Sequence, residues 1–143
     1  MTDKLKLTKR QIRQWVNALR SGKYKQTSGT LCADLGEDDD TEDMRFCCLG
    51  VACDLFLEGD WERADDGGIR LVVGRKYSLG MPPLELQDAI NKSLGFGPED
   101  YNPSKKANKA FEGLEPCEGL AGMNDGGKTF KQIARVIERV AEL

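Results

Sequence analysis

The stretch from Gly122 to Thr129 could bind a phosphate, because its letters match the phosphate-loop pattern G-x4-G-K-[ST]. A nucleotide triphosphatase also needs a buried strand before the loop and further strand–helix units after it. Residues 117–121 do not read as such a strand, and too little chain follows Thr129 for further units. The sequence therefore argues against a nucleotide triphosphatase.

A milder prediction remains for this glycine-rich segment, since it comes just before a helix. Free N–H groups and the helix dipole favour an anion at such a place. In this hypothesis Lys128 neutralises a phosphate, while the N–H groups of Gly126 and Gly127 cradle it. The alternative is a plain glycine turn with Thr129 as a helix cap. The predicted ligand-binding residues are Asn124, Asp125, Gly126, Gly127, Lys128 and Thr129, with Tyr24, Gln26 and Asp54 as neighbours.

The two acidic members of this set, Asp54 and Asp125, suggest a competing hypothesis. The chain contains no histidine, which excludes Ser-His-Asp and Cys-His hydrolases and histidine bases. A carboxylate pair could still cleave a phosphodiester, either with a borrowed metal or by acid–base catalysis. In the binding hypothesis, either carboxylate would accept a hydrogen bond from a sugar or base. No cofactor is expected, and no zinc pattern of cysteine pairs is present.

The cysteines are concentrated in the segment Phe46–Asp54, which reads FCCLGVACD. Cys47 would stand at a helix start, where a thiol gains thiolate character. No histidine can act as its base, however, and buried cysteine usually behaves as a small apolar residue. The sequence favours free thiols in the core or at its rim over a reactive nucleophile or a metal site.

Charge is distributed unevenly along a chain whose net charge is −3. Residues 4–25 carry only basic charges and residues 34–43 only acidic ones. The basic run is either a solvated helix face or a patch for an anionic partner. The acidic run lacks the calcium-loop pattern but could mimic nucleic acid in a protein-binding inhibitor. The helix predicted after Thr129 resembles the first helix of a helix-turn-helix without its recognition helix, so no sequence-specific nucleic-acid binding is expected.

Hydrophobic periodicity predicts a mostly helical α+β fold in one domain, 1–143, with a small β-hairpin or sheet. Capping boxes at Thr8 and Thr129 open the first and last helices. A buried helix is predicted over 46–57, with Gly50 allowing close approach. Further predictions are a hairpin of 61–64 and 69–73, a helix opened by Pro82–Pro83, a loop over 95–117, a short helical turn over 120–124, and an acidic surface-loop insertion at 36–43. No apolar run is long enough to cross a membrane, and no secretion signal is seen.

Three blocks of the sequence resemble a family of small proteins encoded by bacteriophages and prophages. They are W-x2-AL-x-SG-x-Y-x-Q from Trp15, the FCCLGVACD block, and ND-x-G-x-TF-x2-IA-x2-IE from Asn124. The resemblance implies a phage accessory protein in the host cytoplasm that binds a host protein or a small phosphorylated ligand. We therefore expect a non-enzymatic binding protein, engaging a host factor or a nucleotide-like anion; its oligomeric state is left open.

Overall fold

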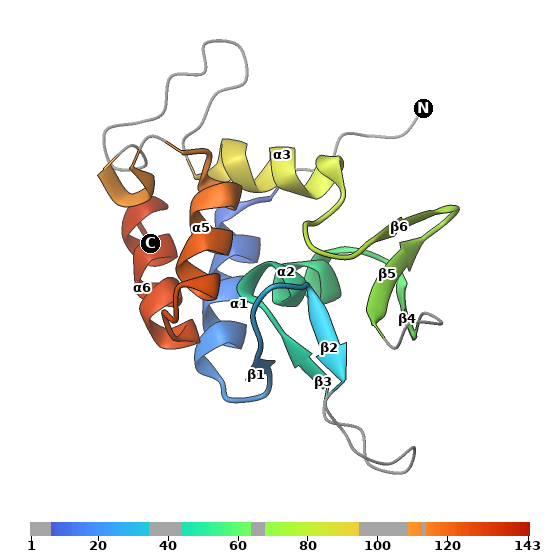
Figure 1. The fold of residues 1–143 in the computed structure, drawn as a ribbon. Helices are drawn as coiled ribbons and strands as arrows, with labels where there is room; N and C mark the ends of the chain where they lie inside the picture. Colours follow the sequence, from blue (N-terminus) through green and yellow to red (C-terminus); the bar gives the residue numbers. More distant parts are fainter. Residues whose placement is uncertain (1–6, 35–43, 64–67, 95–108, 113) are drawn as a thin grey trace, which may run out of the picture.

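Helices gather on one side of the molecule and small sheets on the other in the computed structural model (Figure 1). The structure describes residues 7–34, 44–63, 68–94, 109–112 and 114–143. Helices α1, α5 and α6 lie together, α3 runs across one end, and the strands β4, β5 and β6 project from the opposite side. The predicted α+β class is confirmed. The acidic segment 36–43 and most of the predicted loop 95–117 lie outside the described residues.

The first and last helices form where their capping boxes predicted them. In α1 (Lys9–Arg20) the side chain of Thr8 accepts from the N–H of Gln11. In α6 (Phe130–Val140) the side chain of Thr129 does the same for Gln132. Each helix buries one apolar stripe and exposes basic residues on its outer side. The two helices pack against each other. The buried stripes are Ile12, Trp15, Val16 and Leu19, and Phe130, Ile133, Ala134, Ile137 and Val140.

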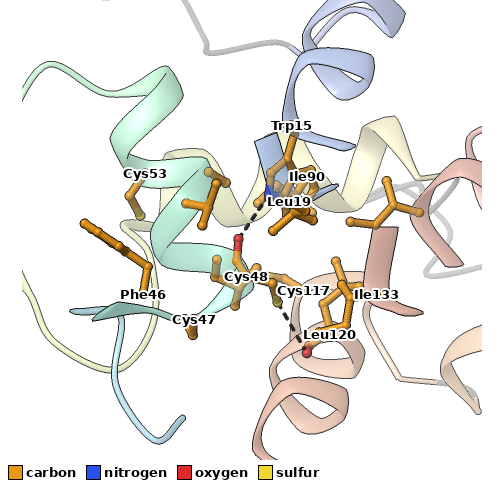
Figure 2. Close-up of a cluster of buried hydrophobic side chains, with 14 of the residues drawn as sticks. Trp15, Leu19, Phe46, Cys47, Cys48, Cys53, Ile90, Cys117, Leu120 and Ile133 are labelled. Carbon is orange, nitrogen blue, oxygen red and sulfur yellow. Dashed lines mark hydrogen bonds between the residues drawn. The ribbon is translucent and has the colours of Figure 1, made fainter. Parts of the chain in front are cut away.

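Helix α2 (Cys48–Phe56) occupies the centre of the core. Figure 2 shows Leu19, Ile90, Leu120 and Ile133, which come from four other helices, among the side chains of this buried cluster. The indole Nε1 of Trp15 donates to the carbonyl of Cys48 at 3.0 Å, so the largest buried side chain also satisfies its polar atom. A helix that is apolar nearly all round is thereby covered on nearly every side.

Two three-stranded sheets flank this core. In the first, β3 is central, paired in parallel with β1 and antiparallel with β2; the second is an antiparallel meander with β5 in the middle. An ion pair between Arg63 and Asp34 joins the sheets. The predicted hairpin is confirmed and gains a third strand. The strands are β1 (Lys25–Gln26), β2 (Cys32–Asp34), β3 (Met44–Phe46), β4 (Asp60–Arg63), β5 (Ile69–Val73) and β6 (Lys76–Ser78).

The predicted helix after Pro82–Pro83 is α3 (Leu84–Ser93), but α5 (Pro116–Asp125) is longer than the turn predicted over 120–124. Pro116 and Cys117 were wrongly assigned to the loop over 95–117, and so were residues 109–111, which are helical. Proline suits the first helical position, and Asn91 of α3 accepts a hydrogen bond from the N–H of Cys117 at 2.9 Å. None of the described helices is long and apolar enough to span a membrane.

Gly50 supplies a direct test of this packing. A Cβ built at Gly50 would lie 2.0 Å from the carbonyl oxygen of Leu31, so α2 would have to move away from the backbone before β2. We expect Gly50→Ala to lower the free energy of unfolding by about 3 kcal/mol, at the upper end of overpacking effects. Guanidinium denaturation would measure the loss.

Gly122→Ala is the matched control, because a Cβ at Gly122 in α5 meets nothing within 4 Å. Alanine should leave the stability unchanged or raise it by about 0.5–1 kcal/mol, since it favours a helix more than glycine does. Equal effects of the two substitutions would show that the approach of α2 to Leu31 is not a constraint on the fold.

Candidate functional site

Asn124, a predicted ligand residue, is committed to contacts inside the protein. Only 2% of its surface is exposed. Its side-chain oxygen accepts from the N–H of Cys48 at 3.1 Å and from Nε2 of Gln26 at 2.9 Å, and its Nδ2 donates to the carbonyl of Thr27 at 2.7 Å. The amide therefore caps the start of α2 from the end of α5 and ties both to the residue after β1.

Gln26 caps the start of α6 with its side-chain amide, as Asn124 caps the start of α2. Its Oε1 accepts from the N–H of Phe130 at 3.0 Å, and its Nε2 donates to the carbonyl of Lys128 at 2.7 Å. The side-chain oxygen of Thr129 accepts a hydrogen bond from the N–H of Gln132 at 3.2 Å. Two of the N–H groups that a helix start offers to an anion are therefore already used within the protein.

Gly126 and Gly127 end α5 before the chain enters α6. The N–H of Gly126 donates to the carbonyl of Gly122 at 2.8 Å, and that of Gly127 to Asn124 at 3.3 Å. Gly127 has a φ of 98°, and the next N–H, of Lys128, donates to Met123 at 3.0 Å. This is the glycine stop common at helix ends. The N–H groups predicted to cradle a phosphate point back into α5, so the geometry matches the capping turn.

Several of the predicted residues do meet in space. An open hollow of about 390 Å³ is lined by Gln26, Asn124, Gly127 and Lys128, together with Thr27 and Ser28. Asp125 is exposed and accepts from the N–H of Gly29 at 2.8 Å. In this set only the Lys128 ammonium is a charged group without a hydrogen bond or ion pair to a described residue.

Tyr24 and Asp54 form a separate cluster with Trp61. The hydroxyl of Tyr24 donates to Oδ2 of Asp54 at 2.6 Å, and the indole Nε1 of Trp61 donates to Oδ1 at 3.1 Å. The ring of Phe46 packs edge-on against both Tyr24 and Trp61. Burial, and then the bond to Asp54, raise the pKa of Tyr24. The two oxygens of Asp54 thus join α2 to β4 and to the residue before β1, and no described interaction connects Asp54 with Asp125.

A larger groove lies on the outer side of α6, and its residues were not predicted from the sequence apart from Lys128. We call it the α6 groove; it measures about 700 Å³. The spacing of Lys131, Arg135 and Arg139, four residues apart and opposite the buried stripe, was the signal that could have indicated it. The groove is lined by Arg20, Ala110, Met123, Lys128, Lys131, Gln132, Ile133, Arg135, Val136 and Arg139.

Most cations of the α6 groove form no ion pair with a described residue. Arg20 forms a two-pronged ion pair with Glu138, at 2.8 and 2.9 Å, and this bond lowers the pKa of Glu138. Among the described carboxylates, none lies within ion-pair distance of the other basic side chains of the groove. Positive potential therefore collects along the exposed side of α6.

The cysteines are core residues, as the sequence favoured. All five are buried and free, and the Sγ of Cys48 donates to the carbonyl of Leu120 at 3.6 Å (Figure 2). Burial raises the pKa of Cys47 although the N–H of Gly50 partly offsets this, and raises the pKa of Cys32 and Cys117 to about 12. A thiol held protonated is a poor nucleophile. Within the described residues, no group of three or more Cys, Asp or Glu side chains could hold a metal ion.

Replacing Asn124 separates a structural role from a ligand role. Asn124→Ala leaves the buried N–H of Cys48 and the carbonyl of Thr27 without partners, so we expect a loss of about 2–4 kcal/mol of stability. Asp125→Ala removes one exposed contact and should cost less than about 1 kcal/mol. Urea denaturation of both variants tests this, and a fully stable Asn124→Ala protein would contradict the capping role.

The raised thiol pKa values predict a loss of stability at alkaline pH. Unfolded thiols ionise near pH 8.5, whereas Cys32 and Cys117 in the folded protein keep their protons to about 12. Their stabilising contribution is complete below about pH 8.5 and declines as the pH rises toward 12, by up to about 1.4 kcal/mol per pH unit for each thiol. Denaturation of the reduced protein between pH 7 and 10 measures the slope. Cys117→Ala should reduce it, and an unchanged slope would count against this assignment.

Comparison of the sequence with known proteins assigns the chain to a family. No curated protein and no solved structure matches it. The family described as Domain of unknown function (DUF8296) matches residues 7–141, which is nearly the whole chain and includes every residue of both hollows. The chain belongs to the DUF8296 family.

Proposed function

We propose that this protein is a non-enzymatic binding protein that holds an anionic partner, a host factor or a nucleotide-like ligand, in the α6 groove. The observation that carries the proposal is the set of basic side chains, Lys128, Lys131, Arg135 and Arg139, around a partly apolar floor, with no described carboxylate paired to them. The volume of about 700 Å³ lies in the range of ligand-binding clefts.

The distribution of charge along the chain also supports anion binding on the side of the molecule that contains α6. The sequence of α1 contains four basic and no acidic residues, and that of α6 contains three basic residues and one acidic residue. The net charge of the whole chain is nevertheless −3, so the rest of the protein is strongly acidic. Such segregation steers an anion toward the packed pair α1 and α6.

The alternative of a carboxylate- or metal-dependent phosphodiesterase has less support. Asp54 is held by Tyr24 and Trp61, and Asp125 by the N–H of Gly29, in two different contacts. Two catalytic carboxylates would have to face one substrate. The inhibitor hypothesis depends on residues 36–43, outside the described residues. Phage origin and action in the host cytoplasm belong to this proposal and rest on the three sequence blocks.

Neutralising the groove tests the proposal with a heparin oligosaccharide as a generic polyanion. We expect Arg135→Gln/Arg139→Gln to bind it about 5- to 30-fold more weakly, since each exposed charge contact contributes about 0.5–1 kcal/mol. Fluorescence anisotropy at low ionic strength gives the Kd, and added salt should weaken the wild-type complex.

The control is Arg75→Gln/Lys76→Gln, which removes the same charge from the exposed turn before β6 and from the first residue of β6. This variant should retain most of the affinity. Equal weakening by both double variants would mean that overall charge, and not the α6 groove, governs binding, and the proposed function would then be wrong.

A further inference from the structure

We infer that the partner of the α6 groove is an acidic amphipathic helix of another protein; this inference rests on the proposed function and specifies its ligand. Lys131, Arg135 and Arg139 follow one another at intervals of four residues, once per helical turn. They span about 12 Å along α6, and Lys128 extends the row beyond the helix start. The positive charges are therefore spread along the helix axis, whereas a single phosphate group needs cations that converge on one place.

A second helix matches this line in its repeat. Acidic side chains four residues apart on a partner helix recur with the same rise as the basic row of α6, so each turn can place one carboxylate beside one cation. Rows at intervals of four residues are also the ridges through which helices most often pack. Arg20 already pairs across from α1 with Glu138 of α6 in this manner.

The floor of the groove fits the apolar stripe of such a helix. Gln132 and Val136 form a second row beside the basic row, and Met123 of α5 lies beyond it, over the fully buried Ile133. Val136 and Met123 are half-buried, so each still exposes apolar surface. A groove with cations along one edge and apolar side chains beside them is complementary to an amphipathic helix with one acidic edge.

The same contacts favour a helix over a nucleic acid strand. Proteins that hold single strands stack bases on aromatic side chains, and no aromatic residue is among the described residues that line the α6 groove. The N–H groups of Gly126, Gly127 and Phe130, which could have met a phosphate, donate to protein acceptors. What remains is a basic row and an aliphatic floor.

The test uses two synthetic peptides of equal composition and a length of about four turns. The first carries glutamate once per turn along one edge of a leucine stripe, and the second has these residues redistributed around the helix. We expect the first to bind at least tenfold more tightly in fluorescence anisotropy. Arg135→Glu/Arg139→Glu should lose this affinity by at least tenfold, whereas Arg75→Glu/Lys76→Glu should not.

A charge exchange makes the test specific. A version of the first peptide with lysine in place of glutamate should bind the Arg135→Glu/Arg139→Glu variant more tightly than it binds the wild type. Circular dichroism of each variant confirms that the fold is intact. Equal binding of the two peptides, or tighter binding of a single-stranded oligonucleotide, would overturn the inference.

The two proposals fail in different ways. If heparin binding depends on Arg135 and Arg139 but the ordered peptide binds no better than the redistributed one, the partner is not a helix and the groove still binds anions. If neither heparin nor peptide binding depends on these arginines, the proposed function and the inferred partner are both wrong.

Discussion

The fold depends on satisfying helix N-termini that begin inside the protein. A buried N–H without a partner costs about 1–3 kcal/mol, so each such start needs an acceptor. Side-chain amides from distant parts of the chain supply these acceptors: Asn124 for α2, Asn91 for α5 and Gln26 for α6. Because each amide belongs to a different element from the helix that it caps, the three bonds also set how the elements lie relative to one another.

This constraint explains why the segment 122–129 has a structural role although its sequence matches the phosphate-loop pattern. The same residues must end α5, start α6 and carry the amide of Asn124 to α2 within a short stretch. Gly127, at a φ of 98°, makes the reversal possible, and the N–H groups are used up in closing α5. Of the charged side chains in this segment, Asp125 accepts from Gly29, whereas Lys128 has no hydrogen bond or ion pair to a described residue and lies at the border of both hollows. The basic surface is consequently formed by side chains along the exposed side of α6, and not by the N–H groups at its N-terminus.

Neighbouring residues in the sequence predicted the helices and strands, whereas contacts between residues far apart in the sequence determine the geometry of the candidate site. The capping boxes at Thr8 and Thr129 and the close approach at Gly50 depend on neighbouring residues or on one helix face, and the sequence was sufficient for them. The first turn of α5 was missed because its acceptor, Asn91, is 26 residues from Cys117. The bonds of Asn124 to Cys48 and Gln26 join residues 76 and 98 positions apart, and no spacing rule encodes them.

The basic row of α6 has an energetic cost in the free protein. Like charges four residues apart on a helix destabilise it by about 0.2–0.5 kcal/mol per pair, and Lys131, Arg135 and Arg139 form two such pairs. Glu138, the one acidic residue of α6, is paired with Arg20 of α1. The buried stripe of α6 and the Gln26 cap hold the helix in spite of this repulsion, so the row is presented on a rigid support. Carboxylates brought by a partner would turn the repulsion into attraction without any rearrangement of α6, because the cations are already in line.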